Sequence, residues 1–243
     1  MQIDSAAQPK PETPERIASI PADLLDGFRF RVCETEEDAT RAIEVRRRVY
    51  RDGSGYTVPV PDDVDARSWL LIAEDVTTGK AVGTVRITPR SGGPLESEEY
   101  IELPKRLARP ETLEITRLAI LPEYRKTNML IPAVSFGLFR LTYEFAMQLG
   151  AQAEVVCSKP ERLMSYVLMG FQPTGRSASY TKLNGAKHEL LWHDFRQADT
   201  MVDNELFRRL YLGQGFPQVE TPEAVPALGL AVSDATYRLA VGD

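Results

Sequence analysis

The sequence is poor in the residue types that carry covalent or metal-dependent catalysis: it has two cysteines and two histidines among 243 residues. Cys33 and Cys157 fall inside predicted strands, which is typical of buried, reduced thiols rather than of a disulfide. His188 and His193 lie in one predicted hairpin, and we interpret each as a surface or hydrogen-bonded histidine rather than a catalyst. No cluster of residues has the spacing of metal ligands, so we expect no metal site.

Other absences concern location and partners. No apolar run approaches the roughly 20 residues that cross a membrane, and residues 1–16 lack the apolar core of a signal peptide. We therefore expect a cytoplasmic protein without an integral membrane segment. The net charge is −6, and no basic run with interleaved aromatic residues occurs, so nucleic acid is not an expected partner.

The apolar residues that are present divide the chain into three parts. Residues 1–26 are expected to form a flexible arm, because the proline-containing segment 8–14 disfavours regular structure. Residues 27–195 alternate predicted strands and helices, which indicates one α/β domain of mixed α+β character, with a mixed central sheet flanked by helices. Residues 196–243 are interrupted by proline and glycine and are interpreted as a C-terminal extension packed on that domain. Its expected elements are a helix over 199–212 and a helix or edge strand over 227–241.

Within the domain, apolar periodicity and turn residues predict the order of the elements. They are a strand (28–33), a helix (36–50), a hairpin (69–73 and 81–88), a central strand (113–121), a long helix (131–149), a strand (153–157), a helix (159–169) and a hairpin (177–183 and 186–194). Thr35 is typical of a helix N-cap, and Ser158 with Glu161 is typical of a capping box. Asn184-Gly185 indicates a tight hairpin turn. Residues 91–110 carry glycine, proline and charge, which predicts a surface excursion.

The stretch 113–125, LEITRLAILPEYR, is the segment around which we expect the fold to be organised. Both faces of its strand are mostly apolar, so the strand is predicted to be central, with a layer on each side. Glu114 and Arg117 are charges inside that strand, and such charges are costly unless they are paired. They are either a structural ion pair or residues of a functional site. Strict alternation places five side chains on one face: Leu113, Ile115, Arg117, Ala119 and Leu121.

Two further arginines occupy inward-facing positions. Arg46 falls in the middle of the apolar stripe of the first predicted helix, and Arg86 lies among the apolar residues of strand 81–88. Arg46 is either a snorkelling side chain at the edge of the stripe or a guanidinium held by carboxylates beside a pocket. Asp62 and Asp65 form a short acidic cluster that is either a solvated turn or the source of those carboxylates.

Two segments resemble GNAT-type N-acyltransferases. Residues 118–125, followed by a polar loop and a long helix, resemble the acyl-coenzyme-A-binding segment, and residues 166–171 resemble the last helix of that fold and its Gly-Phe exit. The resemblance covers about residues 28–195 and implies a GNAT-like fold. Asn128 and Leu130 stand where the usual GNAT loop has glycine or alanine, which let the backbone approach a pyrophosphate. This departure weakens the case for coenzyme A and leaves room for a donor attached to a carrier protein.

A second resemblance rests on charged and aromatic residues in a matching order: Arg46, Tyr50, Tyr56, Asp62, Asp65, Arg86, Glu114, Thr116 and Arg117. This set looks like that of acyl-homoserine-lactone synthases and of the related long-chain N-acyl amino acid synthases. Tyr50 and Tyr56 stand where the lactone synthases usually have Phe and Trp. Together with the extension after residue 195, they favour the N-acyl amino acid branch. The alternatives are a lactone synthase, an acetyl-coenzyme-A-dependent GNAT enzyme and a non-catalytic module that binds acyl carriers.

The implied reaction is attack of an amine on an acyl thioester, with the acyl-phosphopantetheine of acyl carrier protein or acyl-CoA as co-substrate and an amino-acid-like amine as acceptor. Glu114 is the candidate base, directly or through water. Burial should raise its pKa, whereas Arg117 should oppose that change. Backbone N–H groups near Leu118, Ala119 and Ile120 could stabilise the developing negative charge if the strand bulges and splays there.

The remaining candidate residues surround the two substrates. Arg46, Arg86, Asp62 and Asp65 are expected to hold one another and to shape the acceptor pocket, and one of the arginines could bind an acceptor carboxylate. Tyr166 matches the GNAT tyrosine that protonates the leaving thiolate, or else it is a core residue. The expected acyl slot is lined by Val134, Leu138 and Phe145, and the expected donor or carrier contacts are Arg125, Lys126, Asn128 and Met129. The sequence leaves open the acceptor, the acyl length, the carrier and the oligomeric state.

Overall fold

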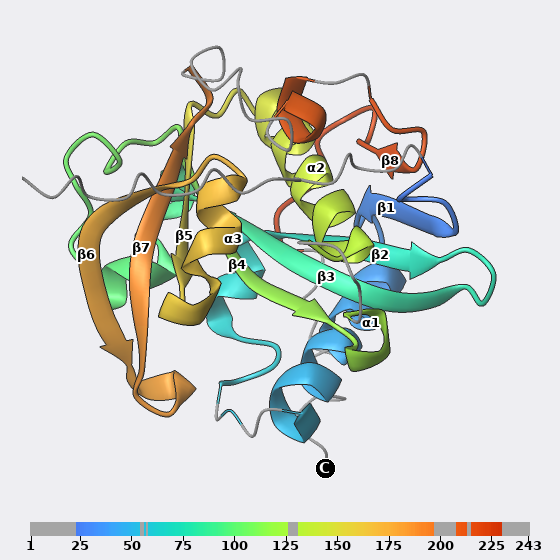
Figure 1. Ribbon diagram of the computed structural model, residues 1–243, viewed down its shortest axis with the longest axis horizontal. Helices are drawn as coiled ribbons and strands as arrows, with labels where there is room; N and C mark the ends of the chain where they lie inside the picture. The colour runs from blue at the N-terminus through green and yellow to red at the C-terminus, as the bar shows by residue number, and fades with distance from the viewer. Residues whose placement is uncertain are drawn as a thin grey trace, which may run out of the picture.

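A mixed sheet of eight strands forms the centre of the protein (Figure 1), in the spatial order β6-β7-β5-β4-β3-β2-β1-β8. The computed structural model describes residues 23–53, 56, 58–125, 131–196, 208–212 and 215–229. The strands are β1 (Phe28–Val32), β2 (Trp69–Asp75), β3 (Lys80–Pro89), β4 (Thr112–Ile120), β5 (Ala153–Ser158), β6 (Gln172–Tyr180), β7 (Ala186–Asp194) and β8 (Val219–Glu220). The pairs β4–β5 and β1–β8 are parallel and the other neighbours are antiparallel, which confirms the predicted mixed sheet.

Helices cover both faces of the sheet, as expected for a central strand that is apolar on both sides. α1 (Glu36–Arg47) packs on one face, where Ile43 contacts the apolar residues of β2. α2 (Ala133–Gln148) and α3 (Leu163–Leu168) pack on the other face, in the main hydrophobic core. The predicted N-cap is confirmed, because Thr35 Oγ1 accepts a hydrogen bond from the backbone N–H of Asp38. α1 then continues as a π-helical turn, Arg48–Gly53.

A glycine sets the distance between α2 and the sheet. A Cβ atom on Gly137 would lie 2.2 Å from Cζ of Phe30, which is fully buried in β1. The helix can therefore approach this strand only because residue 137 has no side chain. This close packing fixes the rotation of α2, and so decides which of its residues face the sheet.

Two local predictions near β5 and β6 are wrong in detail. The capping box at Ser158 does not form: its hydroxyl bonds to the carbonyl of Lys159, and a 3-10 turn, Pro160–Arg162, precedes the six-residue α3. β6 begins at Gln172, because a bulge before Ser177 lets the earlier residues pair with β7. The hairpin itself is confirmed, with Asn184 and Gly185 at φ values of 57° and 72°.

The predicted surface excursion at 91–110 is partly buried. Its apolar residues, which include Leu95, Ile101 and Leu107, form a second hydrophobic cluster with Val155 and Trp192 of β5 and β7. These apolar residues follow neither a helical nor a strand period, and they are interspersed with charges. The pattern therefore hid their burial, and with it the placement of the acidic residues between them.

The described part of the C-terminal extension packs along the α2 side of the domain. The π-helical turn Arg208–Leu212 inserts Leu210 into the main core, and β8 pairs with β1. The chain then reaches the start of β2, where Trp69 Nε1 donates to the carbonyl of Pro226 at 2.9 Å. Residues 1–22, 197–207 and 230–243, which contain most of the predicted arm and parts of both predicted extension elements, lie outside the described residues. Among the described helices, none has the length and apolar character needed to cross a membrane.

Candidate active site

A β-bulge in β4 is the structural origin of the site. Two residues of β4, Arg117 and Leu118, stand opposite the single residue Val85 of β3. Arg117 has a φ of 57°, which is uncommon for a residue with a side chain. The extra residue reverses the alternation of side chains, so that Ile115 and Ile120 both lie in the core on the α2 side. The strict alternation predicted for residues 113–121 is therefore wrong beyond the bulge.

The same strand separates from β5 at this point. The two strands pair in parallel as far as Ile115 and Val156, and then diverge (Figure 1). A cavity of about 420 Å³ opens between them and is lined from both faces of the sheet. On the α2 side the lining is mainly apolar and includes Ile131, Phe139, Val156, Tyr166 and Met169. On the α1 side it is mainly polar and includes Tyr50, Tyr56, Glu96, Glu114 and Lys159.

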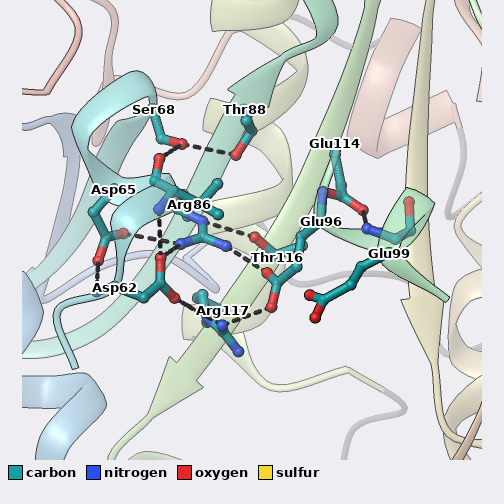
Figure 2. Close-up of polar contacts among 12 residues, drawn as sticks. Asp62, Asp65, Ser68, Arg86, Thr88, Glu96, Glu99, Glu114, Thr116 and Arg117 are labelled. Carbon is teal, nitrogen blue, oxygen red and sulfur yellow. Dashed lines mark hydrogen bonds and ion pairs between the residues drawn. The ribbon is translucent and has the colours of Figure 1, made fainter. Parts of the chain in front are cut away.

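A buried ion network lies beside the polar half of the cavity (Figure 2). The guanidinium of Arg86, which is 0% exposed, contacts Asp62 at 2.5 Å, Asp65 at 3.1 Å and Glu96 at 2.5 Å. Its Nε also donates to Thr116 Oγ1 at 3.0 Å. These contacts come from three separate segments, so Arg86 ties the turn before β2 and the excursion after β3 to the centre of the sheet.

Two more arginines complete the network. Arg46 forms a bidentate pair with Asp65, at 2.9 and 2.7 Å, and both residues are almost fully buried. Arg117 contacts Asp62 at 2.7 Å and Glu96 at 2.6 Å. Burial alone would raise the pKa of Asp65, but Arg46 and Arg86 outweigh it and hold that pKa well below its usual range. Three arginines are thus matched by three carboxylates.

Glu114 is a fourth buried carboxylate, and it is not one of the three that neutralise the arginines. Its two oxygens accept hydrogen bonds from the backbone N–H groups of Glu96, at 2.7 Å, and Ser97, at 2.9 Å. The Glu114–Arg117 ion pair, one of the two alternatives for these charges, does not form, because the bulge turns Arg117 toward Asp62 and Glu96. Burial raises the pKa of Glu114, and the hydrogen bonds from Ser97 oppose that rise. The sequence left open whether burial or Arg117 decides the pKa of Glu114; in the structure burial outweighs the opposing effects, which come from Ser97 and Arg86 rather than from Arg117.

Glu96 is the part of the network that sequence reasoning missed. It lies in the short 3-10 turn Glu96–Glu99, within an acidic run that resembled a solvated surface segment. The structure buries this turn because Glu114 binds its backbone and Arg86 and Arg117 bind the Glu96 carboxylate. The sequence offered three inward-facing arginines but only two aspartates to pair with them. This excess of arginine was the signal that could have revealed a third acid.

The two predicted tyrosines both line the cavity. Their rings meet edge to face, with centroids 6.0 Å apart. Tyr50 Oη donates to the carbonyl of Leu118 at 3.3 Å, which links the π-helical turn after α1 to the bulge. Tyr56 Oη accepts a hydrogen bond from Lys159 Nζ at 2.6 Å. Lys159 follows β5 immediately and was not predicted, because the sequence placed it inside a capping box.

Three residues predicted to line the acyl slot lie elsewhere. Val134 and Leu138 face the sheet beside Gly83, and Phe145 packs edge to face on Trp69 with ring centroids 5.4 Å apart. The prediction used the most apolar stripe of α2, but that stripe belongs to the core. The residues of α2 and its N-terminus that border the cavity are Ile131, Pro132, Ser135 and Phe139.

The remaining predicted residues divide between cavity and core. Leu118 lines the cavity, whereas Ala119 is buried on the α1 side. Tyr166 lines the cavity and also packs against the core, and burial raises the pKa of its phenol above the usual range. Arg125 lines the cavity and donates from Nε to the carbonyl of Ile120 at 2.6 Å. Lys126, Asn128 and Met129 lie outside the described residues.

Cys157 and His188, two cavity-lining residues with nucleophilic potential, are not activated. Cys157 lines the cavity, but burial raises its pKa to about 12, so its thiol stays protonated at neutral pH. His188 also lines the cavity; its Nδ1 lies 2.9 Å from the carbonyl of Ala186, and burial lowers its pKa. Within the described ranges, no three metal-binding side chains come together. The environment of Cys157 therefore does not favour covalent catalysis through its thiol.

Comparison with known proteins identifies the family to which the chain belongs. The model of the FeeM family, N-acyl amino acid synthase FeeM, matches residues 41–194, which is more than half of the chain. The chain belongs to this family. The matched range includes the arginine–carboxylate network, Glu114 and the strands that open the cavity. No curated protein matches the chain by sequence.

Solved structures share the fold. FeeM from uncultured soil microbes, described as an N-acyl amino acid synthase, has a TM-score of 0.56 and 15% identity, over 72% of this chain and 97% of that chain. The CoA-dependent acyl-homoserine lactone synthase BjaI, solved with SAM and isopentyl-CoA, has a TM-score of 0.57 and 18% identity, over 87% and 99%. An acyl-CoA N-acyltransferase from Pseudomonas aeruginosa has a TM-score of 0.52 and 12% identity, over 68% and 99%.

The fold and the family agree with the geometry. The mixed sheet with flanking helices is the GNAT-type fold that the sequence predicted. As a member of the FeeM family, the protein is an N-acyltransferase. The predicted fold class and enzyme class are confirmed.

Proposed function

We propose that the protein transfers a long-chain fatty acyl group from a thioester to the amine of an amino acid, and that acyl carrier protein presents the thioester. The observation that carries this proposal is the two-sided cavity at the bulge of β4. An apolar half lies on the α2 side and a polar half, with a surplus buried carboxylate, lies on the α1 side. Two substrates of different polarity can therefore meet at the gap in the sheet.

The apolar half suits the acyl chain. Phe139 and Met169 lie in the main core and also border the cavity, so an acyl chain placed there would contact packed apolar side chains. The thioester carbonyl would then lie at the bulge, where the extra residue of β4 leaves the regular ladder. In this proposal, the backbone N–H groups of Leu118 and Ala119 stabilise the oxyanion of the tetrahedral intermediate.

The polar half suits an amine that must lose a proton. An amino acid arrives as an ammonium ion, and its nitrogen can attack only after deprotonation. Glu114 lines the cavity and is not needed to neutralise the three arginines, so it is free to take that proton, directly or through a water molecule. Its raised pKa makes it a stronger base than an ordinary glutamate.

The chemical step then balances without a cofactor. The amine nitrogen forms a bond to the thioester carbon, and the carbon–sulfur bond breaks as the tetrahedral intermediate collapses. The nitrogen gives up its second proton as the amide forms, and the leaving thiolate of the phosphopantetheine arm takes one proton, so one proton is released overall. Tyr166 lines the cavity next to Phe139, and we assign it the role of proton donor to that sulfur.

Asn128 and Leu130 support a carrier-bound donor, because these side chains replace the small residues that let a loop approach a pyrophosphate closely. The competing donor is acyl-CoA, and the competing acceptor is the one used by lactone synthases. The pair Tyr50 and Tyr56 argues for an amino acid acceptor.

The proposal is tested by mass spectrometry of lipid extracts from bacteria that express the protein, beside cells that express Glu114→Gln. We expect long-chain N-acyl amino acids in the first extract and a loss of most of that product in the second. Glu102→Gln is the matched control, because Glu102 is exposed and lies outside the cavity. Acyl-homoserine lactones instead of acyl amino acids would overturn the proposed acceptor, and unchanged product in Glu114→Gln would overturn the proposed base.

A further inference from the structure

Most cationic side chains at the cavity are already occupied. Arg46 and Arg86 are fully buried, and their guanidinium groups are held by Asp65 and by the other network carboxylates. Arg117 lines the cavity but is held by Asp62 and Glu96. Binding a substrate carboxylate at any of them would require an existing ion pair to break. The expectation that an arginine of the network binds an acceptor carboxylate therefore conflicts with the geometry.

Lys159 is placed differently. Its ammonium lies 2.6 Å from Tyr56 Oη and 5.2 Å from the centroid of the Tyr56 ring, both of them uncharged groups. Among the described residues, no carboxylate oxygen lies within 4 Å of Lys159 Nζ. The side chain is half-buried and lines the cavity, whereas Arg125 and Arg162 at the cavity are exposed. A half-buried cation without a counter-charge has a strong preference for an anionic ligand.

From these contacts we infer that Lys159 binds the carboxylate of the acceptor amino acid, with Tyr56 as a second hydrogen-bond donor to the same group. The phenol oxygen accepts from the ammonium, so its own O–H can donate to a carboxylate beside Lys159. This inference rests on the proposed function and adds the residue that selects amino acids over simple amines.

The inferred contact also directs the amine. The carboxylate and the amine of an α-amino acid share one carbon atom, so binding the first limits the positions of the second. Lys159 lies at the end of β5, and Glu114 lies in β4 on the other side of the gap, and both line the same cavity. A carboxylate held at Lys159 would leave the amine inside the polar half, near the proposed base and the bulge.

The test measures amine selectivity with purified full-length protein and a long-chain acyl thioester. The acceptors are matched pairs that differ only by the carboxylate: L-leucine with 3-methylbutylamine, and L-tyrosine with tyramine. We expect Lys159→Met to raise the KM for the amino acids on the order of 30-fold, the loss typical of a hydrogen bond to a charged group, and to leave the amines unchanged. Lys159→Arg should restore most of the selectivity, because it restores the charge.

Lys80→Met is the matched control, because Lys80 lies at the β2–β3 turn and pairs with Glu123. An equal loss for amino acids and amines in Lys159→Met would overturn the inference, and so would a raised KM for the acyl donor, which would place Lys159 at a donor phosphate. If the unmodified protein acylates no amine, the proposed function fails and the inference fails with it. If it acylates amino acids and Lys159→Met keeps the same preference for them, only the inference fails.

Discussion

The side chains that surround the two halves of the cavity are buried to a similar degree but are held together by different forces. On the α2 side, Phe139 and Met169 pack against apolar neighbours. On the α1 side, Arg46, Arg86 and Asp65 are just as inaccessible to water, but each is charged. Truncating an apolar side chain on the α2 side loses buried apolar surface and packing contacts. Removing a charge on the α1 side leaves the oppositely charged partner buried and unpaired.

Because of this difference, we expect the α2 side to tolerate substitution, whereas the α1 side holds its groups at fixed positions. Apolar side chains can shift and repack, so the α2 side can accommodate acyl chains of different length. The network permits little movement, because each of its carboxylates contacts at least two groups at hydrogen-bond distance. It therefore keeps Glu96, and through its backbone Glu114, at a fixed position beside the gap in the sheet.

The largest effect is expected from breaking the network at its centre. Arg86→Met leaves Asp62, Asp65 and Glu96 with fewer counter-charges than buried carboxylates, and should lower the free energy of unfolding by about 3 to 5 kcal/mol. Denaturant unfolding at pH 7 measures this change. Arg90→Met is the control and should cost about 1 kcal/mol or less, since Arg90 is half-exposed and, among the described residues, pairs only with Glu98. Equal losses in the two variants would contradict the special role of the network.

On the apolar side, neighbouring positions of α2 should separate stability from substrate choice. Leu138→Ala creates a hole in the core and should lower the free energy of unfolding by about 3 kcal/mol, without changing the preferred acyl length. Phe139→Ala enlarges the cavity itself and should shift the preference toward longer chains. Unfolding curves and product analysis with acyl thioesters of graded length measure both effects. A change in the preferred acyl length caused by Leu138→Ala would instead indicate that Leu138 lines the acyl slot.

A pH dependence should distinguish Glu114 from the network carboxylates. Its pKa is raised on folding, so the protonated form favours the folded state and this contribution is lost as pH rises above about 4.3, the ordinary value for glutamate. The stability of the unmodified protein relative to Glu114→Gln should therefore fall as pH rises through the raised pKa. Asp62 and Asp65 have lowered pKa values, so their contribution is present at neutral pH and is lost at acidic pH.

The measurement is denaturant unfolding of both proteins between pH 4 and pH 8. Activity should change in the opposite direction, because Glu114 can accept a proton only when it is ionised. A difference in stability that does not vary with pH would show that Glu114 does not titrate in this range.

The smallest effect is expected at the tyrosine beside Lys159. Tyr56→Phe keeps the edge-to-face contact with Tyr50 but removes one hydroxyl. We expect the KM for the amino acid to rise about five-fold, corresponding to about 1 kcal/mol for one hydrogen bond. The free energy of unfolding should change by less than about 0.5 kcal/mol, because Tyr56 is only half-buried. A large loss of stability would instead indicate that the Lys159–Tyr56 contact holds the fold together.

The sequence predicted the charged residues of the site better than its apolar lining. Arg46, Arg86 and Arg117 were recognisable because a charge at an inward-facing position requires a partner, and Asp62 and Asp65 were the partners available in a short acidic cluster. Val134, Leu138 and Phe145 were misassigned because an apolar stripe fits a core and a substrate slot equally well. Periodicity shows that such residues are buried, but it does not show which neighbours bury them.

Local features, by contrast, followed directly from residue type. Thr35 caps α1 through its own hydroxyl, and Asn184-Gly185 permits the positive φ values of the hairpin turn. Each of these depends on atoms only a few residues apart. The predictions failed where a distant segment supplied the partner, as for Glu96, whose carboxylate is held by Arg86 and Arg117.

The amino-acid order by itself determined the succession of strands and helices and the presence of buried charges that need counter-charges, because both depend on spacing and on the cost of burying a charge. Only the tertiary structure decided that β4 bulges at Arg117, that Glu96 becomes the third acid of the network, and that Lys159 faces Tyr56 across the cavity. Those outcomes depend on contacts between segments that are far apart in the chain, where a difference of one residue in register changes which side chains meet.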